Sequence, residues 1–175
     1  VYRIDRASRA DGPGVRTTVR LKGCPLRCAW CDSPESHHLE PELVFRPEAC
    51  IRCLSCLDDC QLLAISHRDG EPVVDTHVCR WCGDCADGCP AGARTQAGSV
   101  MTESKVMEEI RRDLDGCAAS GGGVTFSGGE PLLQAAFLER RLDACGALGV
   151  HRAVDTCGHA DADVVRRVAA RTDLF

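Results

Sequence analysis

The sequence predicts an α/β protein whose chain is interrupted by a small cysteine-rich insert. Three strand-like segments alternate with helical segments, and such alternation is typical of a parallel sheet covered by helices. Residues 45–100 break the pattern, because they lack long periodic segments and contain eight of the fourteen cysteines. We therefore expect three parts: a first part at 1–44, an inserted domain at 45–100, and a continuation of the first part at 101–175.

The predicted strands are short and rich in β-branched residues. Residues 15–23, VRTTVRLKG, alternate apolar and polar side chains and end at a glycine, which predicts a half-buried strand. Residues 124–126, VTF, predict a second strand, and residues 150–158, VHRAVDTCG, a third. The chain stops at residues 173–175, DLF, which resemble the start of another strand. We therefore expect the C-terminal part of the protein to be missing.

Helical periodicity fills the segments between these strands. Residues 102–117 predict an amphipathic helix with Thr102 as its N-cap. Its apolar positions recur four residues apart at Val106, Ile110 and Leu114. Pro131 suits the first position of a second helix, and residues 161–173 predict a third.

Composition limits the classes of partner and compartment. The net charge of −5 gives no electrostatic reason to expect nucleic acid or an anionic membrane as a partner. No apolar run approaches the length of about eighteen residues that a membrane span needs, and no signal peptide is visible. We therefore expect a cytoplasmic protein, and clustered cysteines in a reducing compartment usually bind metal.

Two runs of cysteines in the insert share the spacing C-x2-C-x2-C-x3-C, which is that of bacterial ferredoxins. In that arrangement the fourth cysteine of each run binds the other 4Fe–4S cluster. One expected ligand set is Cys50, Cys53, Cys56 and Cys89, and the other is Cys60, Cys79, Cys82 and Cys85. Gln61 stands where the pattern prefers proline, which leaves the ligands unchanged. Structural zinc is the alternative, but two C-x2-C pairs suffice for zinc and the third cysteine of each run is then unexplained.

A third group, Cys24, Cys28 and Cys31, lies on the loop after the first predicted strand, and no fourth cysteine follows for eighteen residues. One interpretation is a zinc site completed by His37 or His38, and another is a set of structural thiols. The functional interpretation is a 4Fe–4S cluster held by three thiolates, with one iron left open for substrate. These three residues would then be the catalytic cysteines.

This loop, with Trp30 directly before its third cysteine, resembles that of the radical S-adenosylmethionine (SAM) enzymes. In that superfamily the amino and carboxylate groups of SAM bind the open iron. Residues 127–133, SGGEPLL, resemble the GGE motif that contacts the methionine amino group of SAM in the same enzymes. A plain strand-to-helix glycine turn is the alternative interpretation of this segment.

Residues 11–17, DGPGVRT, and 155–158, DTCG, narrow the resemblance to the activating enzymes of glycyl radical enzymes, in the subgroup with a ferredoxin-like insert. The resemblance implies the N-terminal part of a partial (β/α) radical SAM barrel. It implies SAM contacts at Trp30, Cys31, Asp32, Gly128, Gly129, Glu130, Asp155 and Thr156. It places the entry of the partner's glycine loop near Asp11, Gly12, Pro13, Gly14 and Arg16. It also suggests that Asp155 helps to bind a monovalent cation, although an isolated strand-end aspartate is commonly a turn residue.

The activity implied by this resemblance is reductive cleavage of SAM. Flavodoxin or ferredoxin supplies an electron, through the insert clusters, to the cluster on the three-cysteine loop. The resulting 5′-deoxyadenosyl radical removes hydrogen from a backbone glycine of a partner glycyl radical enzyme. Two alternatives remain open: a radical SAM enzyme with another substrate, and a non-catalytic iron–sulfur electron carrier. The family's later motifs lie beyond the end of the chain, so we expect this chain alone to cleave SAM poorly.

Three cysteines belong to none of these groups: Cys117, Cys145 and Cys157. Because they have no spacing partner, we expect them to be small buried apolar residues rather than ligands.

Overall fold

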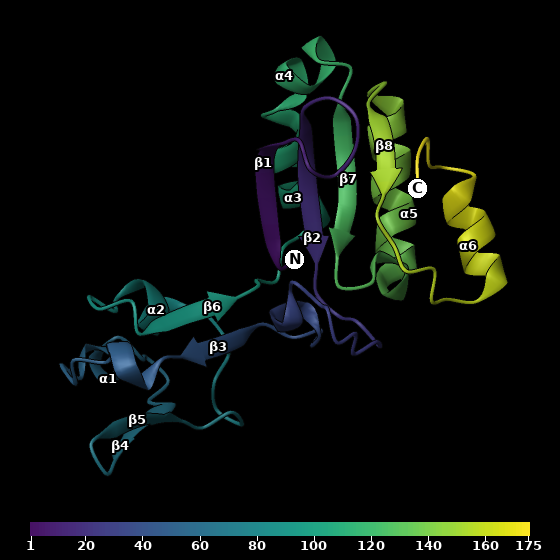
Figure 1. Ribbon diagram of the computed structural model, residues 1–175. Coiled ribbons are helices and arrows are strands. Elements are labelled where there is room, and N and C mark those ends of the chain that lie inside the picture. The colour runs from purple at the N-terminus through teal and green to yellow at the C-terminus, as the bar shows by residue number, and fades with distance from the viewer. The chain divides into compact units, whose positions relative to one another are not determined.

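The computed structural model describes all residues 1–175, which divide into two compact units. The first, called the sheet unit, comprises Val1–Glu40 and Val100–Phe175. The second, called the cysteine unit, comprises Pro41–Ser99. Both units can be followed by colour in Figure 1.

The sheet unit is built on four strands in the order β1-β2-β7-β8. Strands β2 (Arg16–Leu21), β7 (Gly123–Gly128) and β8 (His151–Val154) are parallel, and their arrows point the same way in Figure 1. Strand β1 (Arg3–Ser8) pairs antiparallel with β2 at the edge of the sheet. The sequence did not predict β1, because its charged residues show no apolar alternation. Leu174 adds one parallel bridge to Ala153 of β8.

The helices of the sheet unit follow the strand–helix alternation with two differences. The segment predicted as one helix is broken into α3 and α4, although Thr102 caps α3 as predicted and its hydroxyl accepts from the backbone N–H of Lys105. Pro131 begins a 3-10 turn that leads into α5, rather than an α-helix itself. The elements are η1 (Pro34–Ser36), α3 (Glu103–Arg111), α4 (Leu114–Ala119), η3 (Pro131–Gln134), α5 (Ala135–Ala147) and α6 (Ala162–Ala169). None of the chain's helices has the length and apolar character needed to cross a membrane.

One apolar core joins the sheet to these helices. Val19 of β2 and Phe126 of β7 contribute side chains that are fully buried among those of α3, α5 and α6. In the view of Figure 1, α3 and α5 lie behind the sheet. Fully buried Ile110 and Leu138 carry the core into these two helices.

Strand β2 is buried on both faces, so the predicted half-buried strand is wrong in this respect. Arg16, Thr17 and Thr18 are almost completely buried although they are polar. The reason is that β2 lies between two strands, and the turn before it folds across the face opposite the core. The Asp11 carboxylate in that turn accepts a hydrogen bond of 2.7 Å from the Thr18 hydroxyl.

The cysteine unit consists of two short two-stranded antiparallel sheets and three short helical elements. Strand β3 (Glu42–Phe45) pairs with β6 (Arg94–Ala97), and β4 (Ile65–Arg68) pairs with β5 (Glu71–Val74). The short helical elements are η2 (Pro47–Ala49), α1 (Ser55–Asp58) and α2 (Asp84–Asp87).

An internal repeat relates the two halves of this unit. The shift of 29 residues that carries Cys50 to Cys79 also carries β3 to β5, α1 to α2, and β4 to β6. The backbone follows the same shift, because Leu54 (φ 64°) and Gly83 (φ 96°) are both left-handed, as are Leu63 (φ 52°) and Gly92 (φ 58°). Each half therefore repeats the same local conformation around its cysteines.

Candidate functional site

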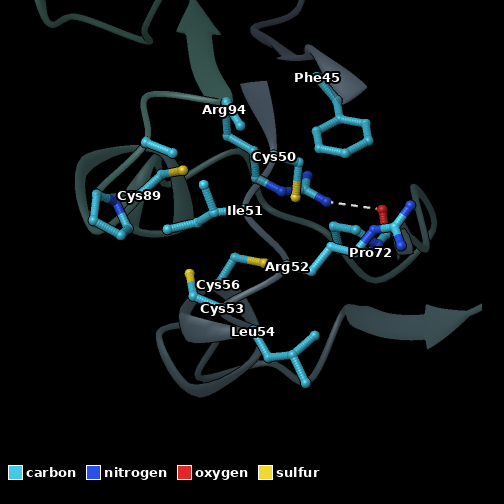
Figure 2. A pocket seen from close by; sticks show the side chains of 13 residues that line it. Phe45, Cys50, Ile51, Arg52, Cys53, Leu54, Cys56, Pro72, Cys89 and Arg94 are labelled. Atoms are coloured by element: carbon cyan, nitrogen blue, oxygen red, sulfur yellow. Dashed lines mark hydrogen bonds between the residues drawn. The ribbon is translucent and has the colours of Figure 1, made fainter. Parts of the chain in front are cut away.

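Two cavities in the cysteine unit are each lined by four thiols. The first, of about 20 Å³, contains Cys50, Cys53, Cys56 and Cys89 (Figure 2). The second, of about 220 Å³, contains Cys60, Cys79, Cys82 and Cys85. The structure thus brings together the two crossed sets that the spacing predicts, each with three cysteines of one run and the last cysteine of the other. No group of three or more His, Cys, Asp or Glu side chains in the chain lies close enough together to hold a single metal ion.

Backbone N–H groups point at the thiols of both sets. The N–H of Ala64 donates to Cys60 Sγ at 3.2 Å, and the N–H of Trp81 donates to Cys79 Sγ at 3.4 Å. Burial raises the pKa of Cys89, but N–H groups of residues 91–94 outweigh it and hold that pKa below its usual value. Such donors stabilise thiolates and the sulfurs of iron–sulfur clusters, so the donor set fits 4Fe–4S groups.

The charge of Arg94 acts on thiols of both sets. Burial raises the pKa of Cys56, while the positive charge of the Arg94 guanidinium acts in the opposite direction. Burial also raises the pKa of Cys85 to about 11, again opposed by Arg94. The two thiols are thus in environments where a nearby positive charge is the main influence favouring thiolate.

The three-cysteine loop begins at the carboxyl end of β2. The N–H of Cys24 donates to the carbonyl of His37 at 2.9 Å, and the N–H of Cys31 donates to the carbonyl of Cys28 at 3.1 Å. All three cysteines are partly buried, whereas the Trp30 side chain is 85% exposed. The loop is therefore held by its backbone, and its tryptophan projects into solvent.

The GGE turn lies directly beside this loop, because β7 is the parallel neighbour of β2. The N–H of Gly129 donates to Leu21 O at 2.9 Å, and that of Glu130 donates to Gly23 O at 2.8 Å. A Cβ on Gly129 would lie 2.2 Å from Gly23 O, so only glycine permits this approach. The glycine turn thus has a structural explanation within the chain itself.

The Glu130 side chain ties the GGE turn to the loop after β8. Its carboxylate is fully buried and accepts from the N–H of Leu132 at 2.8 Å and from the Thr156 hydroxyl at 2.6 Å. It also accepts from the N–H of Cys157 at 2.9 Å and from the Cys157 thiol at 2.6 Å. Two functional candidates, Glu130 and Thr156, therefore bind each other and fix the two loops together.

Cys157 was expected to be buried, and this prediction is wrong. Cys117 and Cys145 are buried, but Cys157 is exposed on the loop after β8. Burial and the hydrogen bond to Glu130 raise the pKa of the Cys157 thiol to about 11. This thiol is therefore a neutral donor to a buried carboxylate, a role that no spacing pattern in the sequence indicates.

A cavity of about 260 Å³, lined by both polar and apolar residues, lies on the face of the sheet opposite the core. It is lined by Asp11 and Gly12 of the DGPG turn, by Thr125 of β7, and by Asp155 after β8. The Ser127 hydroxyl donates to Asp155 Oδ2 at 2.7 Å. The structure thus brings a residue predicted to lie near SAM to the same cavity as part of the predicted partner region.

Arg16 is buried next to this cavity and contacts Thr125, which lines it. Its side chain is fully buried, donating to Thr125 Oγ1 at 2.6 Å, to Pro13 O at 3.0 Å and to Val124 O at 2.7 Å. Its guanidinium therefore holds the DGPG turn against β7.

Comparison with known proteins indicates a 4Fe–4S domain in this chain. A family described as a 4Fe-4S single cluster domain matches residues 10–81. An isethionate sulfite-lyase activating enzyme of Oleidesulfovibrio alaskensis is 40% identical over 164 residues, which are 91% of this chain and 53% of that protein. A trans-4-hydroxy-L-proline dehydratase activating enzyme of Clostridioides difficile is 38% identical over 176 residues, covering 100% of this chain and 58% of that protein.

The chain is a homologue of glycyl-radical enzyme activating enzymes. The resemblance stated from the sequence is therefore confirmed, as is a mixed α/β fold with a 4Fe–4S domain. A 4Fe–4S cluster and SAM are supported as cofactors by the same relatives. The chain spans about half the length of the curated relatives it matches.

Proposed function

We propose that this chain carries the cluster-binding and SAM-binding part of a glycyl-radical enzyme activating enzyme. The observation that supports the proposal is the joining of three loops at the carboxyl edge of the parallel strands. Glu130 binds the cysteine loop through its backbone N–H and the loop after β8 through its carboxylate. In open parallel sheets this edge is where ligands bind.

The residues at this edge have different expected roles. Three thiols, those of Cys24, Cys28 and Cys31, hold a cluster. The turn at Gly129 and the aspartate at 155 take SAM, beside a monovalent cation. When bound, a 4Fe–4S cluster with an open iron supplies the electron that cleaves SAM to methionine and a 5′-deoxyadenosyl radical, which takes hydrogen from a partner's glycine.

The remaining surfaces complete the proposal. The cavity with Asp11 and Gly12 forms one wall of the channel for the glycine loop of the partner, a glycyl radical enzyme. Strands β2, β7 and β8 are the first strands of a partial (β/α) barrel. The cysteine unit holds two further 4Fe–4S clusters that pass electrons from flavodoxin or ferredoxin in the cytoplasm.

Iron content after anaerobic reconstitution tests the ligand sets. Three clusters of four irons give about twelve irons per chain. Cys28→Ala should lower this by about one third and abolish 5′-deoxyadenosine formation under dithionite, because the thiol sets share no member. Cys117→Ala is the matched control, since this buried thiol belongs to no set and its loss should leave the iron unchanged. About four irons per chain, or stoichiometric zinc, would contradict the proposal.

A further inference from the structure

The repeat in the cysteine unit makes its two thiol cavities comparable position by position. A shift of 29 residues carries Cys50, Cys53 and Cys56 to Cys79, Cys82 and Cys85. The reverse shift carries Cys89 to Cys60, so the fourth thiol of each cavity is also equivalent. Apolar lining residues correspond in the same way, as Ala93 of the first cavity does to Ala64 of the second. The positions that differ therefore distinguish two otherwise equivalent sites.

The largest difference is Arg94, which lines the first cavity where Ile65 lines the second. Arg94 is only 3% exposed, and Figure 2 shows its side chain among the thiols and Phe45. Its guanidinium donates to Pro72 O at 2.9 Å and stacks 5.0 Å from the centre of the Phe45 ring. Its buried Nε has no hydrogen-bond partner in the chain. This guanidinium lines the first cavity and forms no ion pair with a carboxylate. Its charge also acts on Cys85 of the second set, although Arg94 does not line the second cavity.

Carboxylates mark the second cavity instead. Asp59 and Asp84 line it, and glycine and serine occupy the equivalent positions, 88 and 55, in the other half. Oδ2 of Asp59 is buried and has no hydrogen-bond partner. The lining of the first cavity contains the buried Arg94, the exposed Arg52 and no carboxylate, whereas that of the second contains two carboxylates and the exposed Arg80.

We propose that the two sites hold clusters of unequal reduction potential, the higher at the first cavity beside Arg94 and the lower at the second cavity beside Asp59. This inference rests on the proposed function, in which both cavities hold 4Fe–4S clusters. Reduction adds one negative charge to a cluster, which a buried cation stabilises and a nearby carboxylate destabilises. N–H groups of Ala64 and Trp81 donate to Cys60 and Cys79 in the second set, and N–H groups of residues 91–94 lower the pKa of Cys89 in the first. The proposal rests on the charged residues, which differ between the two cavities. An electron shared by the pair therefore rests at the first cavity.

Single-cluster variants of the chain allow each potential to be measured alone. In a Cys28→Ala background, Cys82→Ala leaves only the first cavity intact, and Cys53→Ala leaves only the second. The two exposed cysteines are equivalent in the repeat, so the variants are matched. Anaerobic potentiometric titration followed by electron paramagnetic resonance should give the higher midpoint for the first cavity.

Charge variants then test the cause. Arg94→Ile copies the residue of the other half and should lower the midpoint of the first cavity, whereas Arg94→Lys should keep it near the original value. Asp59→Asn should raise the midpoint of the second cavity, and it tests the proposal independently should Arg94→Ile fail to hold iron. Arg68→Gln removes an exposed arginine that lines neither cavity and should change neither midpoint.

The outcomes separate this inference from the proposed function. Two clusters with equal midpoints, or with the reverse order, would overturn the inference and leave the function standing. Unchanged midpoints in both Arg94→Ile and Asp59→Asn would also overturn it. Loss of spin signal and iron from both single-cluster variants would instead show that the cavities hold no clusters, and the proposed function would fail first.

Discussion

The sheet unit and the cysteine unit differ in what can hold them folded. In the sheet unit, large side chains such as Phe126, Leu138 and Ile110 form one continuous buried core. The buried apolar residues of the cysteine unit are few and mostly small: Ala64, Ile65, Cys85, Ala93 and Ala97. Several of its larger apolar side chains are exposed instead, among them Ile51 and Leu63. Small units with so little apolar burial usually need metal or disulfides, so bound clusters should supply the stability of this one.

Removing iron with a chelator should therefore have the largest effect on folding, and it should unfold the cysteine unit but not the sheet unit. Removing iron anaerobically from the reconstituted protein should unfold residues 41–99, because ligand binding and folding are coupled there. The sheet unit should stay folded, since its core contains no ligand of the insert. Hydrogen–deuterium exchange read by mass spectrometry should show loss of protection throughout 41–99, and in the sheet unit only around the loop of Cys24, Cys28 and Cys31.

The contrary outcome is equally clear. If residues 41–99 keep their protection after the iron is gone, the two small sheets are stable without metal. The comparison between the units would then need another explanation. Restoring iron and sulfide provides the control, because protection should return if chelation caused no chemical damage.

A substitution in the apolar core should instead destabilise the sheet unit and leave the cysteine unit unchanged. Leu138 on α5 is fully buried, and Leu138→Ala should reduce the free energy of unfolding of the sheet unit by about 2–5 kcal/mol. Denaturant titration followed by circular dichroism measures this, while the iron content in native buffer should not change. Leu148→Ala, at the exposed end of the same helix, is the matched control and should cost about 0.5 kcal/mol or less.

Loss of iron in Leu138→Ala would mean that the units are not energetically separate. The experiment therefore tests whether the sheet unit and the cysteine unit are energetically separate, as well as the contribution of Leu138 to the core.

The sequence predicted best those features that are decided by neighbouring residues. Thr102 caps α3 because an N-cap needs only its own hydroxyl and the N–H three residues later. Within each cysteine run, the spacing likewise places the first three thiols at one cavity because they lie on one short segment. The fourth thiol of each cavity comes from the other run, which only the ferredoxin pattern indicates. The family was indicated by motifs and is confirmed by the relatives.

Features that depend on distant segments could not be predicted. The charged strand β1 forms because Asp5 meets Arg20 at 2.7 Å across the sheet edge. Glu130 is buried because three donors from residues 156 and 157 reach it, and no local pattern announces them. The face of β2 opposite the core is polar, and the turn before β2 buries it. The alternation of apolar and polar residues in the sequence does not predict the path of that turn.

The smallest effect concerns a difference within the cysteine unit rather than between the units. Leu63 (φ 52°) and Gly92 (φ 58°) occupy equivalent left-handed positions of the repeat. A left-handed conformation costs a residue with a Cβ about 1–2 kcal/mol, whereas glycine loses about 0.5–1 kcal/mol more backbone entropy on folding. The Leu63 side chain is 83% exposed, so its removal sacrifices little packing. Leu63→Gly should therefore stabilise the loaded unit by about 0.5–1 kcal/mol, which would slow iron loss to a chelator about two- to fivefold. Gly92→Leu is the converse variant: a Cβ there meets no atom within 4 Å, so its expected faster iron loss reports the backbone cost alone. Faster loss in both variants would show that Leu63 contributes contacts that outweigh its conformation, and that the two halves of the unit are less alike than their backbones.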